Sequence, residues 1–429
     1  MKQRSFIFFI SISLSISAQS KFDYKQFTKT MCTPEFHGRG YVNSGDSIAA
    51  QFIARQFNLL SIDSLASGYF QSFSFPVNTF PDTCSVSLGE NKLTPGKDFI
   101  AAPISGGSCG EMECTAKSLK VHFISGKNFI EMKGRNVSDQ LHLKTEDILV
   151  VDNSIYSSDS SREINYYIGK YATKNNVIET VSKKFTWSVS PMKNEYVYLQ
   201  IKASLFENDI KGLKVKIHLH HKYVGAHLAN NVLGFIPSRK KAKGTVMLTA
   251  HYDHLGRLGS ETYFPGGNDN ASGVAMMLQL GDLIKRTPLK NYNTVLVAFA
   301  GEEIGLLGSK YLSENPLFEL DKVRFLLNLD IMGSGEEGIT AVNGRVFKKE
   351  YQKLQKLNKR IKAVPVVKAR GKAANSDHYF FTEKGIASFF VYTMGANKNY
   401  HDVYDTYEAL SFESFEKLSL LFNKFIRKL

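Results

Sequence analysis

The sequence HYDHLG at residues 251–256, continued by GNDNASG at 267–273 and AGEEIGL at 300–306, decides the fold of this chain. The first and third pieces adjoin the apolar runs 245–250 and 294–300. Short apolar runs bounded by polar or turn residues are typical of buried strands. The sequence therefore predicts two buried strands, each ending where polar side chains begin.

A helix is predicted over 271–285, because apolar side chains recur there at helical spacing. His251 is then expected just past one strand, and Asp269 at the start of the helix. Glu302 and Glu303 come just past the other strand. In open α/β sheets, ligands bind beyond the carboxyl ends of the strands. An imidazole and three carboxylates at that edge are a suitable donor set for a metal ion.

Length and composition indicate a globular chain with a leader. The 429 residues favour two domains, and 43% apolar with 22% charged residues is ordinary for a globular protein. Residues 1–20 are interpreted as a signal peptide for export to the periplasm or the medium, with Lys2 and Arg4 before an apolar stretch at 6–16. An uncleaved anchor is the alternative. No other run is long and apolar enough to span a bilayer, so no stable membrane insertion is expected.

The basic charge does not identify a partner. Removal of Lys2 and Arg4 with the leader lowers the formal charge from +14 to +12. Basic residues are dispersed without a long tract, so we interpret them as a solvated surface and expect no nucleic-acid partner. The sequence makes no prediction of oligomeric state.

The four cysteines, at positions 32, 84, 109 and 114, all precede the motif region. Export permits disulfides, and three pairings remain open. None of the four lies near the His-containing motifs, which argues against a cysteine nucleophile.

The hydrophobic pattern divides the chain into three parts. Residues 21–80 are assigned to the N-terminal part of one domain, 81–228 to a β-rich insertion, and 229–429 to the rest of the first domain. In the insertion, strands are predicted at 85–88, 119–124, 147–151 and 213–220. In the last part, strands are predicted at 231–236, 245–250, 294–300, 323–329, 339–342, 364–367 and 387–392, and helices at 271–285, 306–312, 348–359, 378–384 and 412–428. This alternation predicts a three-layer α/β domain.

Two further motifs complete the candidate site. Asp330 follows the predicted strand 323–329, and His401 lies in a loop before the last helix. The candidate nitrogen and oxygen ligands are then His251, Asp269, Glu303, Asp330 and His401. Two zinc ions that share one carboxylate need about three protein ligands each and leave a position for water.

This set, in this order, resembles the zinc aminopeptidase family that includes bacterial leucyl aminopeptidase, glutamate carboxypeptidase and glutaminyl cyclase. The resemblance covers 229–429 closely and 22–80 weakly. It implies a three-layer α/β/α peptidase domain with a mixed central sheet, and places the insertion where relatives carry a protease-associated domain.

The resemblance also implies roles. His251 and Asp330 would hold one zinc ion, Glu303 and His401 the other, and Asp269 would bridge the two. Glu302 would be the general base. Asp253 would orient His251 from behind, and Asp405 would do the same for His401.

Departures from the family concern the pocket. Ser376-Asp377-His378 matches a family motif beside the substrate pocket, but the Tyr that some members carry before it is absent. Tyr379, Tyr392 and Arg370 are candidates for the missing oxyanion donor. His254 and His378 have no assigned role.

The function expected from these motifs is that of an exported aminopeptidase acting on peptides with a free N-terminus. Glutaminyl cyclase is an alternative, although cyclases carry Trp before the last ligand histidine. Here that residue is Tyr400, and the only tryptophan is Trp187, inside the insertion. A non-catalytic binding protein is the third reading, which the complete ligand set disfavours.

Overall fold

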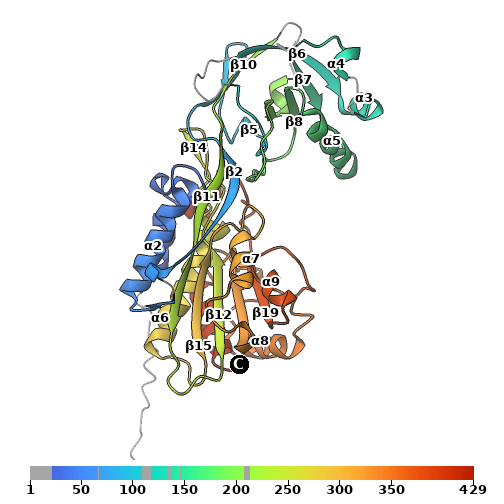
Figure 1. Cartoon of the computed structure of the whole chain (residues 1–429). Coiled ribbons are helices and arrows are strands. Elements are labelled where there is room, and N and C mark those ends of the chain that lie inside the picture. The colour runs from blue at the N-terminus through green and yellow to red at the C-terminus, as the bar shows by residue number, and fades with distance from the viewer. Residues whose placement is uncertain (1–21, 66, 109–116, 134–136, 145–146, 207–212) are drawn as a thin grey trace, which may run out of the picture.

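The protein is analysed as a computed structural model that describes residues 22–65, 67–108, 117–133, 137–144, 147–206 and 213–429 (Figure 1). The predicted leader, Cys109 and Cys114 lie outside these residues. Cys32 and Cys84 are described, and both are free thiols. Within the described part of the chain, no helix has the length and apolar character needed to cross a membrane.

A nine-stranded mixed sheet forms the centre of the larger part of the molecule (Figure 1). Its strands lie in the order β1 (Asp63–Ser64), β11 (Lys222–Ile236), β15 (Asn293–Phe299), β12 (Thr245–His251), β16 (Val323–Leu329), β19 (Ser388–Met394), β17 (Gly338–Val342) and β18 (Val367–Ala369), and β2 (Phe70–Thr79) also pairs with β11. β15, β12, β16 and β19 run parallel, whereas β11 and β17 are antiparallel to their neighbours β15 and β19. The predicted mixed central sheet is confirmed.

Helices cover both faces of this sheet. The helices on one face are α1 (Tyr24–Met31), α2 (Gly45–Leu59), α6 (Ser272–Arg286), α8 (Lys348–Ile361) and α10 (Phe415–Ile426); those on the other are α7 (Leu307–Glu314) and α9 (Tyr379–Glu383). Side chains alternate between the two faces of a strand. In β12, Val246 and Leu248 therefore pack with the first group, and Met247 packs with the second. The predicted three-layer arrangement is confirmed.

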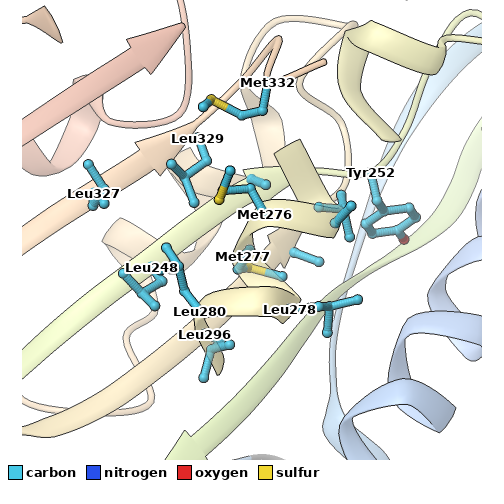
Figure 2. Packing of buried hydrophobic residues seen from close by; sticks show 14 of the residues in the cluster. Leu248, Tyr252, Met276, Met277, Leu278, Leu280, Leu296, Leu327, Leu329 and Met332 are labelled. Atoms are coloured by element: carbon cyan, nitrogen blue, oxygen red, sulfur yellow. The ribbon is translucent and has the colours of Figure 1, made fainter. Parts of the chain in front are cut away.

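Helix α6 lies at the centre of the first layer and is buried around most of its circumference. Figure 2 shows its Met276 and Leu280 in one apolar cluster with Leu248 of β12 and Leu329 of β16. A helix that is apolar on all sides belongs in a core. This packing holds the first turn of α6 in place, and with it the preceding loop that carries Asp269.

A second, eight-stranded sheet forms the other part of the molecule. Its order is β4 (Asn91–Leu93), β3 (Cys84–Leu88), β10 (Lys214–Leu219), β6 (Lys117–Ser125), β7 (Asp147–Asp152), β8 (Val177–Val181), β9 (Tyr198–Lys202) and β5 (Phe99–Ala101). β6, β7, β8 and β9 are parallel. The helices associated with this sheet are α3 (Gly126–Glu131), α4 (Val137–Gln140) and α5 (Ser158–Tyr171).

The two parts are linked by long strands and by a common buried cluster. The long strands β2 and β11 extend from the larger sheet towards the smaller one (Figure 1). β11 runs unbroken through the predicted boundary at 228/229, and the domain limits remain a prediction. Leu255, Leu258 and Phe264, which follow β12, belong to the same buried cluster as Trp187 and Leu199 of the second part. The second sheet is therefore packed against the loops around the candidate site.

Candidate metal centre

Three adjacent strands bring polar side chains to one edge of the larger sheet. His251 is the last residue of β12, Asp330 directly follows β16, and Glu302 and Glu303 come shortly after β15. Both β15 and β16 run parallel to β12, which lies between them. The carboxyl ends of parallel strands meet at one edge, so these four side chains converge as the sequence predicted.

Two loops supply the remaining donors. Asp269 lies in the turn η4 (Gly267–Ala271), where its peptide bond to Asn270 is cis, and His401 lies between β19 and α10. Asp405 accepts hydrogen bonds from the main-chain N–H groups of Asn268 and Asp269, each at 2.9 Å. The expectation that Asp405 orients His401 is therefore wrong: its carboxylate holds the Asp269 loop.

The Asp269 carboxylate lies between two His–carboxylate pairs. Its Oδ1 is 3.3 Å from His251 Nε2, which is also 3.4 Å from Asp330 Oδ1. Its Oδ2 is 3.2 Å from His401 Nε2, which is also 3.1 Å from Glu303 Oε2. Each oxygen of Asp269 thus faces a different imidazole, each of which has its own second carboxylate.

The spacing of these donors fits zinc coordination. Ligand atoms at about 2.0–2.1 Å around a tetrahedral zinc ion lie about 3.3 Å from one another. The His–carboxylate contacts around Asp269 span 3.1–3.4 Å, and all come from nitrogen and oxygen atoms. His251, Glu302 and Asp330 also offer ligand atoms within 4.8 Å of one another, which places Glu302 beside the His251 half.

Glu302 and Glu303 are neighbours with opposite electrostatic environments. Burial raises the pKa of Glu302 well above its usual range, His251 offsets part of this, and Asp377 and Glu303 raise the pKa further. Burial also acts on Glu303, but His401 and His254 lower its pKa to about 2. Carboxylates whose pKa values are pushed apart are suited to different tasks. The surroundings of Glu303 therefore favour its anion, and those of Glu302 favour its protonated form.

His254 orients Glu303. Its Nδ1 lies 2.6 Å from Glu303 Oε1, which leaves Oε2 to face His401. The sequence gave His254 no role, although its position three residues after His251 in the first motif could have indicated that it lies at the site. Within the Ser376-Asp377-His378 motif, Ser376 donates to Asp330 Oδ2 at 3.1 Å and accepts from Asn328 at 2.8 Å.

Asp253 lies under the Glu302–Glu303 turn. Its carboxylate accepts the N–H groups of Glu302 and Glu303, at 3.3 and 3.2 Å, and the hydroxyl of Tyr41. The distance from its Oδ1 to His251 Nδ1 is 3.9 Å, whereas its main-chain oxygen is 3.2 Å from the same nitrogen. Asp253 thus touches His251 through its backbone and fixes Glu302 through its side chain. Nothing in the local sequence pointed to Tyr41.

Arg39 lies fully buried beneath the centre. It donates hydrogen bonds to the main-chain oxygens of Tyr252 at 2.8 Å, Met31 at 3.0 Å and Gly266 at 2.7 Å. These bonds tie the N-terminal segment to the loops after β12 and before Asp269. A buried guanidinium whose N–H groups are hydrogen-bonded to main-chain oxygens stabilises the loops that carry those oxygens, here next to a cluster of carboxylates.

Two further histidines, His218 and His220, lie away from this centre. His218 and His220 are on β10 and the following residue, and His220 pairs with Asp82 at 2.6 Å. Neither belongs to a group of potential metal ligands among the described residues. Of the candidate oxyanion donors, Arg370 donates to the Tyr392 hydroxyl at 3.2 Å.

Comparisons with known proteins agree with this geometry. The profile described as peptidase family M28 matches residues 231–426. A probable leucine aminopeptidase of Arthroderma otae is 27% identical over 215 residues, 48% of this chain and 56% of that protein. Aminopeptidase YwaD of Bacillus subtilis is 36% identical over 114 residues, 25% of this chain and 23% of that protein. The chain thus spans about half or less of the length of these curated relatives.

Solved structures show the same fold over nearly the whole chain. A zinc aminopeptidase from Bacillus subtilis is 19% identical, with a TM-score of 0.67 and 94% of both chains covered. A peptidase M28 precursor from Shewanella amazonensis is 16% identical, with a TM-score of 0.66 and coverage of 94% of this chain and 91% of that chain.

The fold is shared with solved structures of a zinc aminopeptidase and a peptidase M28 precursor. The match over residues 231–426 relates this part of the chain in particular to peptidase family M28.

Proposed function

We propose that this chain is an exported aminopeptidase that uses two zinc ions and takes Glu302 as its general base. The observation that carries the proposal is the Asp269 carboxylate, whose two oxygens face the separate pairs His251–Asp330 and His401–Glu303. The names of the relatives, which include zinc aminopeptidases, support the choice of metal and reaction. Export is proposed from residues 1–20, which lie outside the described part of the chain.

Zinc ions bound by these donors would polarise the scissile carbonyl and lower the pKa of the attacking water towards about 7. Glu302 then accepts a proton from that water and later returns it to the leaving amine. The Glu302 side chain is placed for this by the hydrogen bond from its own N–H to Asp253. Burial raises the pKa of Glu302, which makes its ionised carboxylate a stronger proton acceptor.

A free α-amine suits the charge of this site. Asp269, Glu302, Glu303 and Asp330 bring four carboxyl groups together, and Asp377 adds a fifth nearby. A group of carboxylates attracts a cation, and an N-terminal ammonium is the cation that a peptide carries next to its first scissile bond.

One contact of Trp187 favours a glutaminyl cyclase, and another argues against it. The structure brings Trp187 against His401, although the two are 214 residues apart in sequence. However, the Trp187 ring is buried and stacks on Phe264 at 4.5 Å, so it is not offered to a substrate. The residue stacked on His401 is Tyr400, at 3.9 Å.

Metal removal and a substrate panel test the proposal. We expect chelation to abolish hydrolysis of aminoacyl-arylamides and added zinc to restore it. N-acetylated versions of the same substrates should react about 10- to 100-fold more slowly, because they lose a charged hydrogen bond of about 1.5–3 kcal/mol. Release of arylamine measures both. Turnover that survives chelation would contradict the metal mechanism, and equal rates on blocked substrates would contradict an aminopeptidase. Cyclisation of N-terminal Gln without amino-acid release would select the cyclase.

A further inference from the structure

Trp187 and His401 are joined by two hydrogen bonds. The main-chain N–H of Trp187 donates to the main-chain oxygen of His401 at 2.9 Å, and His401 Nδ1 lies 2.9 Å from the main-chain oxygen of Trp187. Trp187 lies between β8 and β9, in the part of the chain that forms the second sheet. The second part of the molecule thus contacts a candidate metal ligand directly.

The second hydrogen bond decides which nitrogen of His401 carries the proton. A carbonyl oxygen can only accept, so Nδ1 must hold the hydrogen. In the neutral ring Nε2 then presents its lone pair, and Nε2 is the atom that faces Asp269 and Glu303. Metal-ligating histidines commonly depend on such a partner for their tautomer and ring orientation.

The Trp187 main chain is itself held by its side chain. The indole Nε1–H donates to the oxygen of Ala101, at the end of β5, at 2.7 Å. The indole ring stacks on Phe264 at 4.5 Å, and Trp187 is only 3% exposed. Phe264 belongs to the loop that leads to Asp269. The indole therefore links the second sheet to the loop before Asp269, and the Trp187 main chain links it to His401.

An ion pair supports the same contact. Lys184 pairs with Asp402, the neighbour of His401, and donates to the main-chain oxygen of Lys398 at 2.9 Å. Asp402 is buried and accepts the N–H of Tyr404 at 2.8 Å. The segment 184–187, called here the Trp187 strap, is thus fastened along the loop that carries His401.

We infer that the Trp187 strap is a working part of the metal centre: Trp187 is a positioning residue that fixes the tautomer and orientation of His401 for the ion held with Glu303 and Asp269. The inference rests on the proposed two-ion function. It gives the second part of the molecule a role at the metal centre, because the carbonyl that accepts from His401 Nδ1 belongs to the strap.

Competition titration with a chromogenic chelator tests this through zinc affinity and stoichiometry rather than turnover. Trp187→Ala keeps the main-chain carbonyl but removes the indole that holds it in place, so we expect one of two zinc ions to bind up to about 10- to 100-fold more weakly, the range seen when the partner of a ligand histidine is disturbed. The other ion, between His251 and Asp330, should bind as in the unmodified protein. Trp187→Phe keeps a ring against Phe264 but loses the bond to Ala101, so its effect should be smaller.

Ile168→Ala is the matched control. Ile168 is fully buried in α5, in a different apolar cluster of the second sheet from Trp187. It should lower the melting temperature and leave both zinc affinities unchanged. Unchanged zinc affinities in Trp187→Ala would overturn the inference. So would a loss of both ions that is equal in Trp187→Ala and in Ile168→Ala. If Trp187→Ala does not fold, Trp187→Phe decides by the same two criteria. An unmodified protein that binds fewer than two ions would instead refute the proposed function.

Discussion

Replacement of Glu302 by glutamine is expected to lower kcat by about 10²- to 10⁴-fold while the protein keeps its zinc. Glutamine has nearly the same shape and preserves the N–H bond to Asp253, but it cannot accept a proton from the attacking water. Glu302 does not contact Asp269 or His401 in the ion-pair network, so its loss should leave the bridging carboxylate in place. Steady-state kinetics together with zinc quantification measure the two effects separately.

The neighbouring residue provides the contrast. Glu303→Gln removes an anion that faces His401 and is oriented by His254. It should therefore release zinc, and added zinc should partly restore turnover, which it cannot do for Glu302→Gln. Glu314→Gln, at an exposed position in α7, should change neither quantity. A Glu302→Gln enzyme with full turnover would remove Glu302 from the role of base.

Asp269→Asn is expected to produce the second large loss. The change removes the charge shared by His251 and His401 and replaces one oxygen with an amide nitrogen that cannot bind a cation. Zinc content should fall from two ions to one or none. Charge stabilisation by metals contributes several kcal/mol to the transition state, so kcat/KM should fall on the order of 10³-fold.

Asp282→Asn is the control for this change. Asp282 is also buried, lies on α6 and pairs with Arg286 at 2.8 Å on the same helix, away from the candidate ligands. Its replacement should cost stability and leave the zinc content at two. Two zinc ions retained at full affinity in Asp269→Asn would show that Asp269 does not bridge them.

The sequence was sufficient for the elements that position the strand-borne donors. The predicted strand 323–329 coincides with β16, 245–250 ends one residue before β12 does, and 294–300 is shifted by one residue relative to β15. These strands are buried on both faces, so their apolar runs have clear limits. Because they are parallel, the position of a polar residue after each run also predicted which side chains meet.

Elements with mixed exposure were harder to predict. β11 begins at Lys222, whereas the prediction began at 231, because the first half of the strand is largely exposed and carries polar residues. Helix α5 was missed inside a region read as β-rich, although Ile164, Ile168 and Tyr171 lie at helical spacing and are buried. In such segments the apolar residues fit both the helical and the strand period, and the turn residues on either side favoured the prediction of strands.

Contacts between distant segments could not be read from sequence at all. The carbonyl partner of His401 comes from Trp187, and a backbone oxygen has no sequence signature. The same holds for the donors to Asp253, two of which are main-chain N–H groups. Asp405 was expected from the family resemblance to orient His401, but the fold turns its carboxylate to the Asp269 loop.

Anomalous scattering at the zinc edge, from crystals of the zinc-loaded protein, tests the central claim most directly. We expect two peaks about 3.5–4 Å apart, one beside His251 and Asp330, the other beside Glu303 and His401, with Asp269 contacting both. A single peak, or peaks that none of these side chains contacts, would contradict the two-ion site.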